Sequence, residues 1–527
     1  MPGEASSRVR TAEVAATLCL ATDLGMGFPF EQGLRSTLVA MRLAERLGVD
    51  RATSSQTYYA CLLMYSGCTT ETDVTTAIFG GSMASHLVPA TFGSPREQLT
   101  GVLRALPTPG SSPPARAAQI ARRLPKAMRT RDPHLAAICE VAQMLADRLA
   151  LPPSIHELFV HLTDRWDGKG PLRRGKADEI PLALRIVHVA RDATLQSLLG
   201  GEVFALRTVR ERAGHGFDPE VAACLADAPE ILAVEQGSSA WDVTLACEPE
   251  PRRVLEDEAL DDALRALGSF ADLISPYLSG HSIGVAGLAR SAAEGCRLDD
   301  VGAAAVWRAG LLHDLGRAAV HPRIWQKPAA LSADEWEHVR LHPYQTERVL
   351  SRSPFLASLG QIAGAHHERL DRSGYHRGSS GAELPLPARI LAAADAYHAM
   401  TEPRPHRDAF SAEEAADELA GEASAGRLDA DAVKAVIEAA GQRAPRLERP
   451  AGLTAREAEV VSLLARGLQT KQIARELSIS VKTADHHIQS SYRKMGVSTR
   501  AGATLFAMEH GLVAWGEVPI ARRNPPS

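Results

Sequence analysis

Two stretches of the chain repeat one another: DRWDGKGPLRRGKADEIPLALRI, residues 164–186, and ERLDRSGYHRGSSGAELPLPARI, residues 368–390. They align without a gap at an offset of 204 residues, so that Asp167 corresponds to Asp371. The aligned positions share further glycine, proline and arginine residues: Gly170 with Gly374, Pro181 with Pro385, and Arg185 with Arg389. A shared spacing of these residue types indicates an internal duplication.

A second match lies upstream of the first in both copies. CLLMYSG (Cys61–Gly67) corresponds to GLLHDLG (Gly310–Gly316) at an offset of 249 residues. Between the two matches of the first copy lies PTPGSSPP (Pro107–Pro114), which we expect to be a non-helical linker because of its prolines. We place copy one at about 20–245 and copy two at about 255–440. The alternative is two unrelated helical domains whose loops match by coincidence.

The bulk composition limits the classes of protein to be considered. A chain of 527 residues is long enough for several domains, and its net charge of -5 means that any contact with nucleic acid must come from a local patch. The seven cysteines form no CxxC pair, which favours reduced thiols over a zinc ribbon or a disulfide framework. No apolar run approaches about 18 residues and no signal core precedes the first domain, so we expect a cytoplasmic protein without a membrane span.

Helical periodicity recurs through most of the chain and strand signals are sparse, so the sequence predicts an all-α fold with two related helical domains and a smaller helical C-terminal domain. We expect the domains to have the following boundaries: copy one over 1–250, copy two over 251–442, a linker over 443–452, the C-terminal domain over 453–515 and a tail over 516–527.

The C-terminal domain has the pattern of a helix-turn-helix. Thr454 and Glu457 form a capping box at the start of a first helix, and Val481 to Met495 is the third helix. One face of the third helix is apolar: Ala484, Ile488, Tyr492 and Met495. The opposite face is polar: Lys482, Asp485, His486, Gln489 and Arg493. From 481 to 500 there are four basic residues, including Arg500, and one acid, a local excess that suits DNA.

This stretch, with Arg456-Glu457, Lys482-Thr483 and Gly496-Val497 among the matching residues, resembles the LuxR-type helix-turn-helix. The resemblance implies a four-helix domain whose third helix enters the major groove of double-stranded DNA, bound as a homodimer. It implies contacts with phosphates or base edges from Lys471, Ser480, Lys482, Thr483, Asp485, His486, Gln489, Arg493 and Lys494. Asp485 departs from the family, which often has a basic residue there. The alternative is a domain that mediates only protein contacts.

Copy two concentrates groups that suit a transition metal. The members are His281, His313, Asp314, His342, His366, His367 and Asp395. Neutral imidazoles and carboxylates are suitable ligands for iron, manganese, zinc or magnesium. The adjacent pair His313-Asp314 lets the aspartate bridge two metals while the histidine binds one of them.

The order of these groups, in LLHDLGR, LHPYQTERVL, HHERLDRSGYHRG and ADAYHAMTEPRPHR, resembles the HD-GYP branch of the metal-dependent HD phosphohydrolases. The resemblance implies that all seven residues are metal ligands and that cyclic di-GMP or another nucleotide phosphoester is hydrolysed. It also implies that Arg317, Arg404 and Arg407 contact phosphate, with Asp314 and Arg317 catalytic. In such metal-assisted hydrolysis a water attacks phosphorus in line while positive groups neutralise the growing charge.

Four positions of copy two depart from the family pattern. His376 replaces the proline of the GYP tripeptide, Arg317 replaces a lysine, and His398 replaces an aspartate. Members with three metals have a glutamate one turn before the first histidine ligand, where this chain has Tyr277. We therefore expect two divalent ions, iron, manganese or another transition metal.

Copy one keeps the frame of the repeat but none of the ligands. In the order of the seven ligands, its aligned residues are Gln32, Met64, Tyr65, Ile138, Leu162, Thr163 and Arg191. We expect a metal-free pseudo-domain that pairs with copy two, senses a ligand or serves as scaffold. For the whole chain the sequence predicts a LuxR-type transcriptional regulator with a metal-dependent phosphodiesterase domain. The alternative is a transcription factor whose HD-like region only senses a ligand or dimerises, without turnover.

Overall fold

The computed structural model describes residues 8–69, 78–79, 86–233, 239–379, 381, 383–443, 450–509 and 512. Within these ranges the only strands are β1 (Arg8–Arg10) and β2 (Val254–Glu256), which pair antiparallel. The expectation of an all-α fold is therefore confirmed. No helix among the described residues has the length and apolar character that crossing a membrane requires. The predicted tail at 516–527 lies outside the described residues, as does most of the predicted linker.

The chain forms two compact units, each assembled from more than one segment. The first unit comprises residues 1–279, 315–326 and 348–355, and the second comprises 280–314, 327–347 and 356–527. Copy two therefore contributes to both units, whereas copy one and the C-terminal domain each lie in one. The predicted domain boundaries, which rest on the sequence repeats, remain a proposal.

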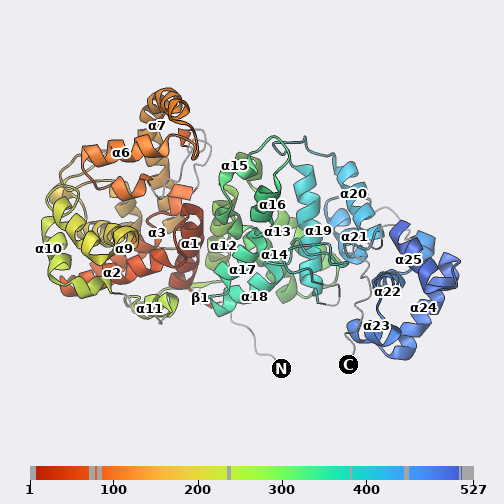
Figure 1. Ribbon diagram of the computed structural model, residues 1–527. Helices are drawn as coiled ribbons and strands as arrows, with labels where there is room; N and C mark the ends of the chain where they lie inside the picture. Colours follow the sequence, from red (N-terminus) through yellow and green to blue (C-terminus); the bar gives the residue numbers. More distant parts are fainter. Residues whose placement is uncertain are drawn as a thin grey trace, which may run out of the picture. The chain divides into compact units, whose positions relative to one another are not determined.

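The helices of the first unit follow copy one and the start of copy two (Figure 1). Its helices are α1 (Thr11–Met26), α2 (Gln32–Arg46), α3 (Arg51–Leu63), α6 (Pro95–Ala105), α7 (Pro113–Arg148), α8 (Pro153–His156), α9 (Leu182–Arg212), α10 (Pro219–Asp227), α11 (Ala240–Ala246), α12 (Asp257–Asp272) and α15 (Pro322–Trp325). The 3-10 turn η7 (Leu315–Ala319) also belongs here and packs against α1 and α12.

The second unit contains the rest of copy two and the C-terminal domain. Its helices are α13 (His281–Gly295), α14 (Asp300–Leu312), α16 (Ala333–Arg340), most of α17 (His342–Leu350) and α18 (Pro354–Ala363), α19 (Leu386–Thr401), α20 (Ala412–Ser424), α21 (Ala430–Ala439), α22 (Ala455–Ala465), α23 (Thr470–Glu476), α24 (Val481–Met495) and α25 (Arg500–Glu509). In the copy-two part, α13 packs against α14, α19 and α21 (Figure 1).

The helix boundaries repeat at the offsets found in the sequence. α13 begins and ends 249 residues after α2, and α14 does the same relative to α3. α19 begins 204 residues after α9. The caps repeat as well, because Asp50 accepts a hydrogen bond from the Thr53 amide at 2.7 Å and Asp299 accepts one from the Gly302 amide at 2.8 Å. The two copies therefore share one local fold, which supports the duplication.

The residues that both copies keep have packing roles. Arg185 donates to Asp218 at 2.6 Å, and Arg389 donates to Asp429 at 3.0 Å. Each aspartate is also the N-cap of the helix that follows, α10 or α21. A Cβ atom on Gly374 would lie 2.5 Å from the His367 carbonyl oxygen, and one on Gly170 would lie 2.8 Å from the Thr163 carbonyl oxygen. These positions are retained because backbone and helix caps approach closely there.

One expectation is wrong in detail. PTPGSSPP was expected to be non-helical throughout, but α7 begins at Pro113. Proline fits the first turn of a helix because its missing N–H has no intrahelical acceptor there.

The C-terminal domain has the four helices that the resemblance implies. Thr454 and Glu457 close the predicted capping box through bonds of 2.7 and 3.2 Å, and α24 has the predicted bounds. Gly496 ends α24 in the left-handed conformation with a φ of 67°. The core contains the predicted apolar face of α24: Ala484, Ile488 and Met495 are buried, and half-buried Tyr492 packs against them.

Candidate metal centre and DNA-binding face

All seven predicted metal ligands lie in the second unit and face one centre. His281 begins α13, His313 and Asp314 follow α14, and His342 begins α17. His366 and His367 follow α18, and Asp395 lies within α19. Six of the seven are buried, and the His367 side chain is 18% exposed. Residues far apart in sequence are therefore brought together as the sequence predicted.

The Asp314 carboxylate lies between two groups of histidines. Its Oδ2 atom is 2.9 Å from His313 Nε2 and 3.4 Å from His281 Nε2. Its Oδ1 atom is 3.2 Å from His342 Nε2 and 3.5 Å from His366 Nε2. One carboxylate that offers a different oxygen to each group has the arrangement needed to bridge two cations.

The remaining ligands extend these two groups. Asp395 Oδ1 is 3.3 Å from His281 Nε2 and 3.7 Å from His313 Nε2, next to Asp314 Oδ2, and Asp395 Oδ2 is 3.7 Å from His367 Nδ1. His342, His366 and His367 form another set of donors that lie close enough to hold one ion. The ring centroids of His366 and His367 are 4.1 Å apart.

The second nitrogen of each central histidine is held in place. The Nδ1 atoms of His313, His342 and His366 lie 2.7, 2.6 and 2.7 Å from the carbonyl oxygens of Gly310, Val339 and Ala363. A carbonyl oxygen only accepts, so each Nδ1 donates and each Nε2 presents a lone pair to the centre when the ring is neutral. Metal-binding histidines are usually oriented in this way. The donor set therefore fits divalent transition metals.

The electrostatics of the centre favour positive charge. Burial alone would lower the pKa of His313, but Asp314 and Asp395 outweigh it and raise that pKa to about 9. Burial and the neighbouring His366 hold the pKa of His367 well below its usual range. The two carboxylates thus make the site attractive to cations, while His367 stays neutral, the form in which histidine binds metals.

Two side chains near the centre were not predicted as site residues. Glu402 Oε2 lies 2.8 Å from His281 Nδ1, and Glu402 Oε1 lies 3.3 Å from His398 Nδ1. These three residues could together hold an ion. Because His281 already directs Nε2 toward Asp314 and Asp395, its Nδ1 is better placed to donate to Glu402. Glu402 is then a positioning residue, and its only sequence signal was its place one turn after His398.

The arginines expected at phosphate occupy different environments. Arg404 donates to Glu402 Oε2 at 2.8 Å, which places it beside the centre. Arg407 donates to the carbonyl oxygens of Ala399 and Met400 at 2.6 and 3.1 Å, so its guanidinium holds its own loop. Arg317 is buried in η7 and packs over the Trp325 ring at 5.2 Å. Phosphate contact by all three stays a prediction, and Arg407 would have to give up these bonds to make it.

The loop after His367 contacts that ligand directly. The Tyr375 ring lies 4.7 Å from the His367 ring, centroid to centroid. Glu368 accepts hydrogen bonds from the amides of Arg377 and Ser379 at 2.7 and 2.8 Å, which folds the loop back on itself. We call residues 368–379 the substrate loop. His376, at the site of the missing proline, is half-buried and lies 5.7 Å from the Tyr344 ring.

Copy one has a buried arginine and a buried aspartate in the corresponding place. Arg191, aligned with Asp395, is buried and lies over the ring of Tyr65, which is aligned with Asp314, at 4.5 Å. Asp23 accepts the Gly33 amide at 3.0 Å, and burial raises the pKa of Asp23 to about 7 although Arg191 opposes this shift. A fixed guanidinium therefore supplies positive charge where copy two has metal ligands.

The predicted DNA-binding residues form an exposed surface on α23 and α24. Eight of the nine are exposed and without a role in the core: Lys471, Ser480, Lys482, Thr483, Asp485, His486, Gln489 and Arg493. Ser480 is the N-cap of α24 and accepts the Thr483 amide at 3.0 Å, so its backbone conformation starts the third helix. This surface is available to a duplex.

The other two basic residues counted with this face have structural roles. Lys494 donates to Glu457 at 2.6 Å, and the Lys494 ammonium together with Ser490 and Thr454 holds the pKa of buried Glu457 down at about 2, although burial opposes this shift. Arg500 donates to the carbonyl oxygen of Leu464 at the end of α22. Of the four basic residues counted from 481 to 500, Lys494 and Arg500 therefore also stabilise the fold of the domain.

The pairing of Lys494 with Glu457 distinguishes Lys494 from Lys482, although the family resemblance assigns both to DNA contacts. We expect Lys494→Ala to destabilise the domain by about 1–3 kcal/mol, since it removes the partner of a buried carboxylate. We expect Lys482→Ala to leave stability unchanged and to lessen the salt dependence of DNA binding by about one counterion. Thermal unfolding and salt titration of DNA binding on the full chain measure both. Equal stability losses in the two variants would contradict the assignment.

Comparison with known proteins finds a family model over each of these two regions. The family model described as "HD domain" matches residues 265–432, and the model described as "Bacterial regulatory proteins, luxR family" matches residues 451–507. The first range contains all seven predicted metal ligands, and the second contains all nine predicted DNA-binding residues.

Among relatives, the 3'3'-cGAMP-specific phosphodiesterase 3 of Vibrio cholerae is 34% identical over 281 residues, covering 52% of this chain and 60% of the relative. The cyclic di-GMP phosphodiesterase of Thermotoga maritima is 33% identical over 174 residues, covering 33% of this chain and 47% of the relative. The chain thus spans less than two thirds of each.

A solved structure of a cyclic GMP-AMP specific phosphodiesterase of Vibrio cholerae matches 82% of this chain and 98% of that chain, with a TM-score of 0.55 and 24% identity. That level of identity supports a shared fold. The chain therefore carries an HD domain and a LuxR-family regulatory domain, and it is homologous to cyclic dinucleotide phosphodiesterases.

Proposed function

We propose that the HD domain holds two divalent metals and hydrolyses a phosphodiester bond of a guanine-containing cyclic dinucleotide, with cyclic di-GMP the leading candidate. The observation that carries the proposal is the position of the Asp314 carboxylate, whose two oxygens each face two of the predicted histidine ligands. The names of the relatives, which act on cyclic di-GMP or on 3'3'-cGAMP, support the substrate class.

The roles of the side chains follow from their contacts. One ion would be held by His281, His313 and Asp395, the other by His342, His366 and His367, with Asp314 shared. Divalent ions there supply Lewis acidity and lower the pKa of water. Arg404 and Arg317 supply positive charge for phosphate oxygens, and Tyr375, which lies against His367, offers a ring on which a base could stack.

Metal content tests the two-ion arrangement separately from turnover. We expect the full chain to carry about two transition-metal ions, and His342→Ala to lose the ion held with His366 and His367 while it keeps the other. The matched control is His338→Ala, an exposed histidine on the preceding helix α16. Elemental analysis giving three ions in the wild type, or no loss in His342→Ala, would contradict the assignment.

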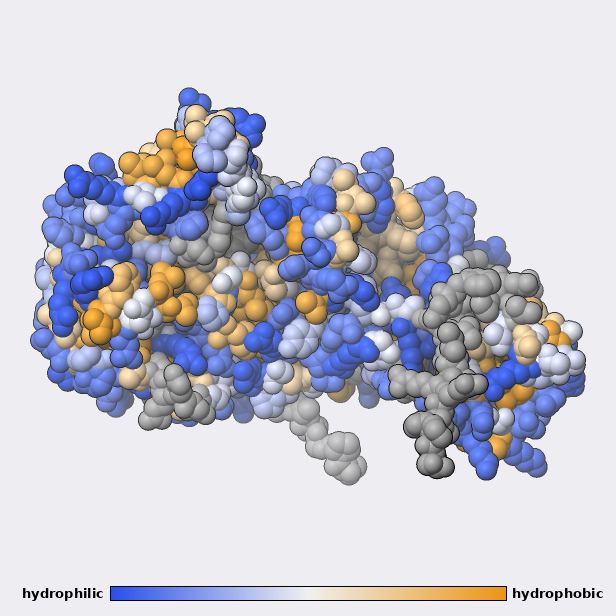
Figure 2. Space-filling model, viewed as in Figure 1, coloured by the Kyte–Doolittle hydropathy of each residue, from blue (hydrophilic) through white to orange (hydrophobic). Residues whose placement is uncertain are grey.

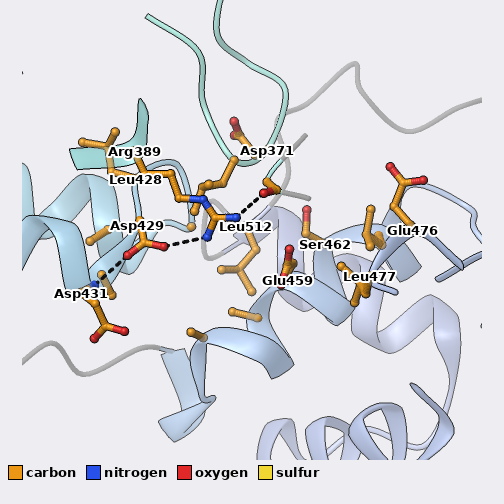
Figure 3. Close-up of a pocket in the computed structure, with 18 of the residues that line it drawn as sticks. Asp371, Arg389, Leu428, Asp429, Asp431, Glu459, Ser462, Glu476, Leu477 and Leu512 are labelled. Carbon is orange, nitrogen blue, oxygen red and sulfur yellow. Dashed lines mark hydrogen bonds and ion pairs between the residues drawn. The ribbon is translucent and has the colours of Figure 1, made fainter. Parts of the chain in front are cut away.

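We also propose that the state of the HD site is transmitted to DNA binding. The substrate loop carries Arg372, whose Nη2 donates to Glu476 Oε1 on α23 at 2.6 Å. Beside this pair lies a small cavity of about 120 Å³, lined by Asp371, Arg389, Asp429, Glu459 and Leu512 among others (Figure 3). The loop thus contacts His367, a predicted metal ligand, through Tyr375, and it contacts the helix-turn-helix through Arg372.

The ion pair is the simplest place to test this coupling. We expect a phosphorothioate analogue of cyclic di-GMP to change the Kd of the full chain for a duplex selected from random sequences, and Arg372→Ala to reduce that change. Because both side chains are partly exposed, the effect is expected to be about two- to fivefold. Arg377→Ala is the control, since Arg377 lies on the same loop and pairs with Glu347. An analogue effect that persists in Arg372→Ala contradicts this route.

The competing function is a transcription factor whose HD domain binds a ligand without turnover. Arg317, Tyr277 and His376 depart from the enzyme pattern and favour it. Turnover at full metal occupancy separates the two functions. Pairing of the chain into a homodimer on DNA stays a prediction in both.

A further inference from the structure

Copy one contains a cavity where copy two has its metal site. The cavity has a volume of about 460 Å³, which lies within the usual range for small-molecule sites. Five of the seven positions aligned with metal ligands line it: Met64, Tyr65, Ile138, Leu162 and Thr163. Gly170, aligned with Gly374 of the substrate loop, lines it as well. Copy one thus has a cavity at these positions, and mainly apolar side chains stand there in place of the predicted metal ligands.

The wall of this cavity is apolar and its mouth is open to solvent. Further wall residues include Ile78, Val88 and Val102. Leu99 on α6 and Met128 on α7 also line it, and they are 53% and 54% exposed. Figure 2 shows hydrophobic side chains gathered on the surface where α6 and α7 lie. Exposed apolar side chains of this kind mark entrances and binding surfaces.

The charge around the cavity has one sign. Four basic residues are among those that line it: Arg131, His134, Lys169 and Arg173. No aspartate or glutamate lines it among the described residues. Buried Arg191 lies over the Tyr65 ring, and neither Arg191 nor Asp23 is among the residues that line the cavity.

We propose that copy one binds an amphipathic organic anion, with an aliphatic chain or ring in the apolar cavity and a carboxylate at the basic rim. The aligned positions lack metal ligands, and the part of the cavity lined by α6 and α7 can accommodate an apolar group of the ligand. The binding step transfers apolar surface out of water, and the exposed rim charges add selectivity for anions. This site is distinct from the HD metal centre and does not depend on its activity.

The test uses the full chain and decanoate below its micellar concentration, followed by calorimetry. We expect saturable binding of one decanoate per chain and binding at least tenfold weaker for decyltrimethylammonium. Val102→Trp on α6 and Leu135→Trp on α7, which fill the cavity from two helices, are each expected to weaken decanoate binding at least tenfold. Val203→Trp, at a site 84% exposed on α9, should leave it unchanged.

The rim is tested separately. Replacing Arg131, Lys169 and Arg173 together by glutamine should weaken decanoate about tenfold and leave the binding of decanol unchanged. Thermal unfolding identifies which of the two tryptophan variants remains folded, and decanoate binding is compared with the wild type for that variant. Absence of saturable binding for both decanoate and 4-phenylbutyrate, equal binding of the ammonium, or binding unaffected by the cavity-filling change would each overturn the proposal. Loss of phosphodiesterase activity would not bear on it.

Discussion

Asp314→Ala is expected to abolish turnover of cyclic di-GMP, by several powers of ten, and to lower metal content. The reason is geometric, because each Asp314 oxygen faces a different pair of histidine Nε2 atoms at 2.9 to 3.5 Å. Without it the two ions lose their shared ligand, and the chemistry that needs both is lost. Product formation by chromatography and elemental analysis of the same sample measure the two effects.

The matched control for this change is Asp23→Asn in copy one. Asp23 is also a buried carboxylate, but it accepts a hydrogen bond from the Gly33 amide and has no counterpart among the predicted ligands. We expect Asp23→Asn to alter stability while the metal content per folded chain stays at the wild-type value. Full activity in Asp314→Ala, or metal loss in Asp23→Asn, would show that the metal has been placed in the wrong copy.

Arg317→Ala is expected to lower turnover by roughly 10²–10³, the effect of removing one stabiliser of the charge that develops on phosphate. Arg317 follows the metal-ligand pair by three residues and is held against Trp325, so its position is fixed before substrate arrives. We expect metal content to be unchanged, which distinguishes this role from that of a ligand. Steady-state kinetics with cyclic di-GMP, beside elemental analysis, checks both.

Arg317→Lys tests whether Arg317 acts on cyclic di-GMP through its charge or serves a different phosphate ester. A lysine keeps the positive charge but loses the planar group that lies over Trp325. If the charge is what matters for cyclic di-GMP, Arg317→Lys should retain or raise activity, as in the family pattern. If Arg317 serves a different phosphate ester, Arg317→Lys should lower it. An alanine variant with wild-type kcat and KM would remove Arg317 from the mechanism altogether.

The fold was predictable where helical periodicity or an internal repeat indicated the helices. The helical pattern and the offsets of 204 and 249 residues were visible in the sequence, and the boundaries of α2, α3, α13 and α14 follow them. The start of α7 was not predicted, because proline at Pro113 was taken as a break although it suits a first turn. The division into two units was not predictable either, since η7 and α15 of copy two belong to the unit of copy one.

The cluster of seven candidate ligands was predictable because each member is a histidine or aspartate within a recognisable motif. Glu402 and the pairing of Lys494 were missed for a common reason. Charged residues are mostly solvated, and their spacing in the sequence does not reveal a buried partner far along the chain. Glu402 meets His281 across 121 residues of sequence, and Lys494 meets Glu457 across 37. Only the packing of the helices brings these pairs together.

The central claim is tested most directly by turnover on the metal-replete full chain. The protein is supplied with manganese or ferrous iron, its metal content is measured, and it is incubated with cyclic di-GMP, 3'3'-cGAMP and simple nucleoside phosphates. The account predicts about two ions per chain and cleavage of a guanine-containing cyclic dinucleotide, with cyclic di-GMP preferred. Tight binding of these nucleotides without any product, at that metal occupancy, would contradict it and identify the HD domain as a sensor.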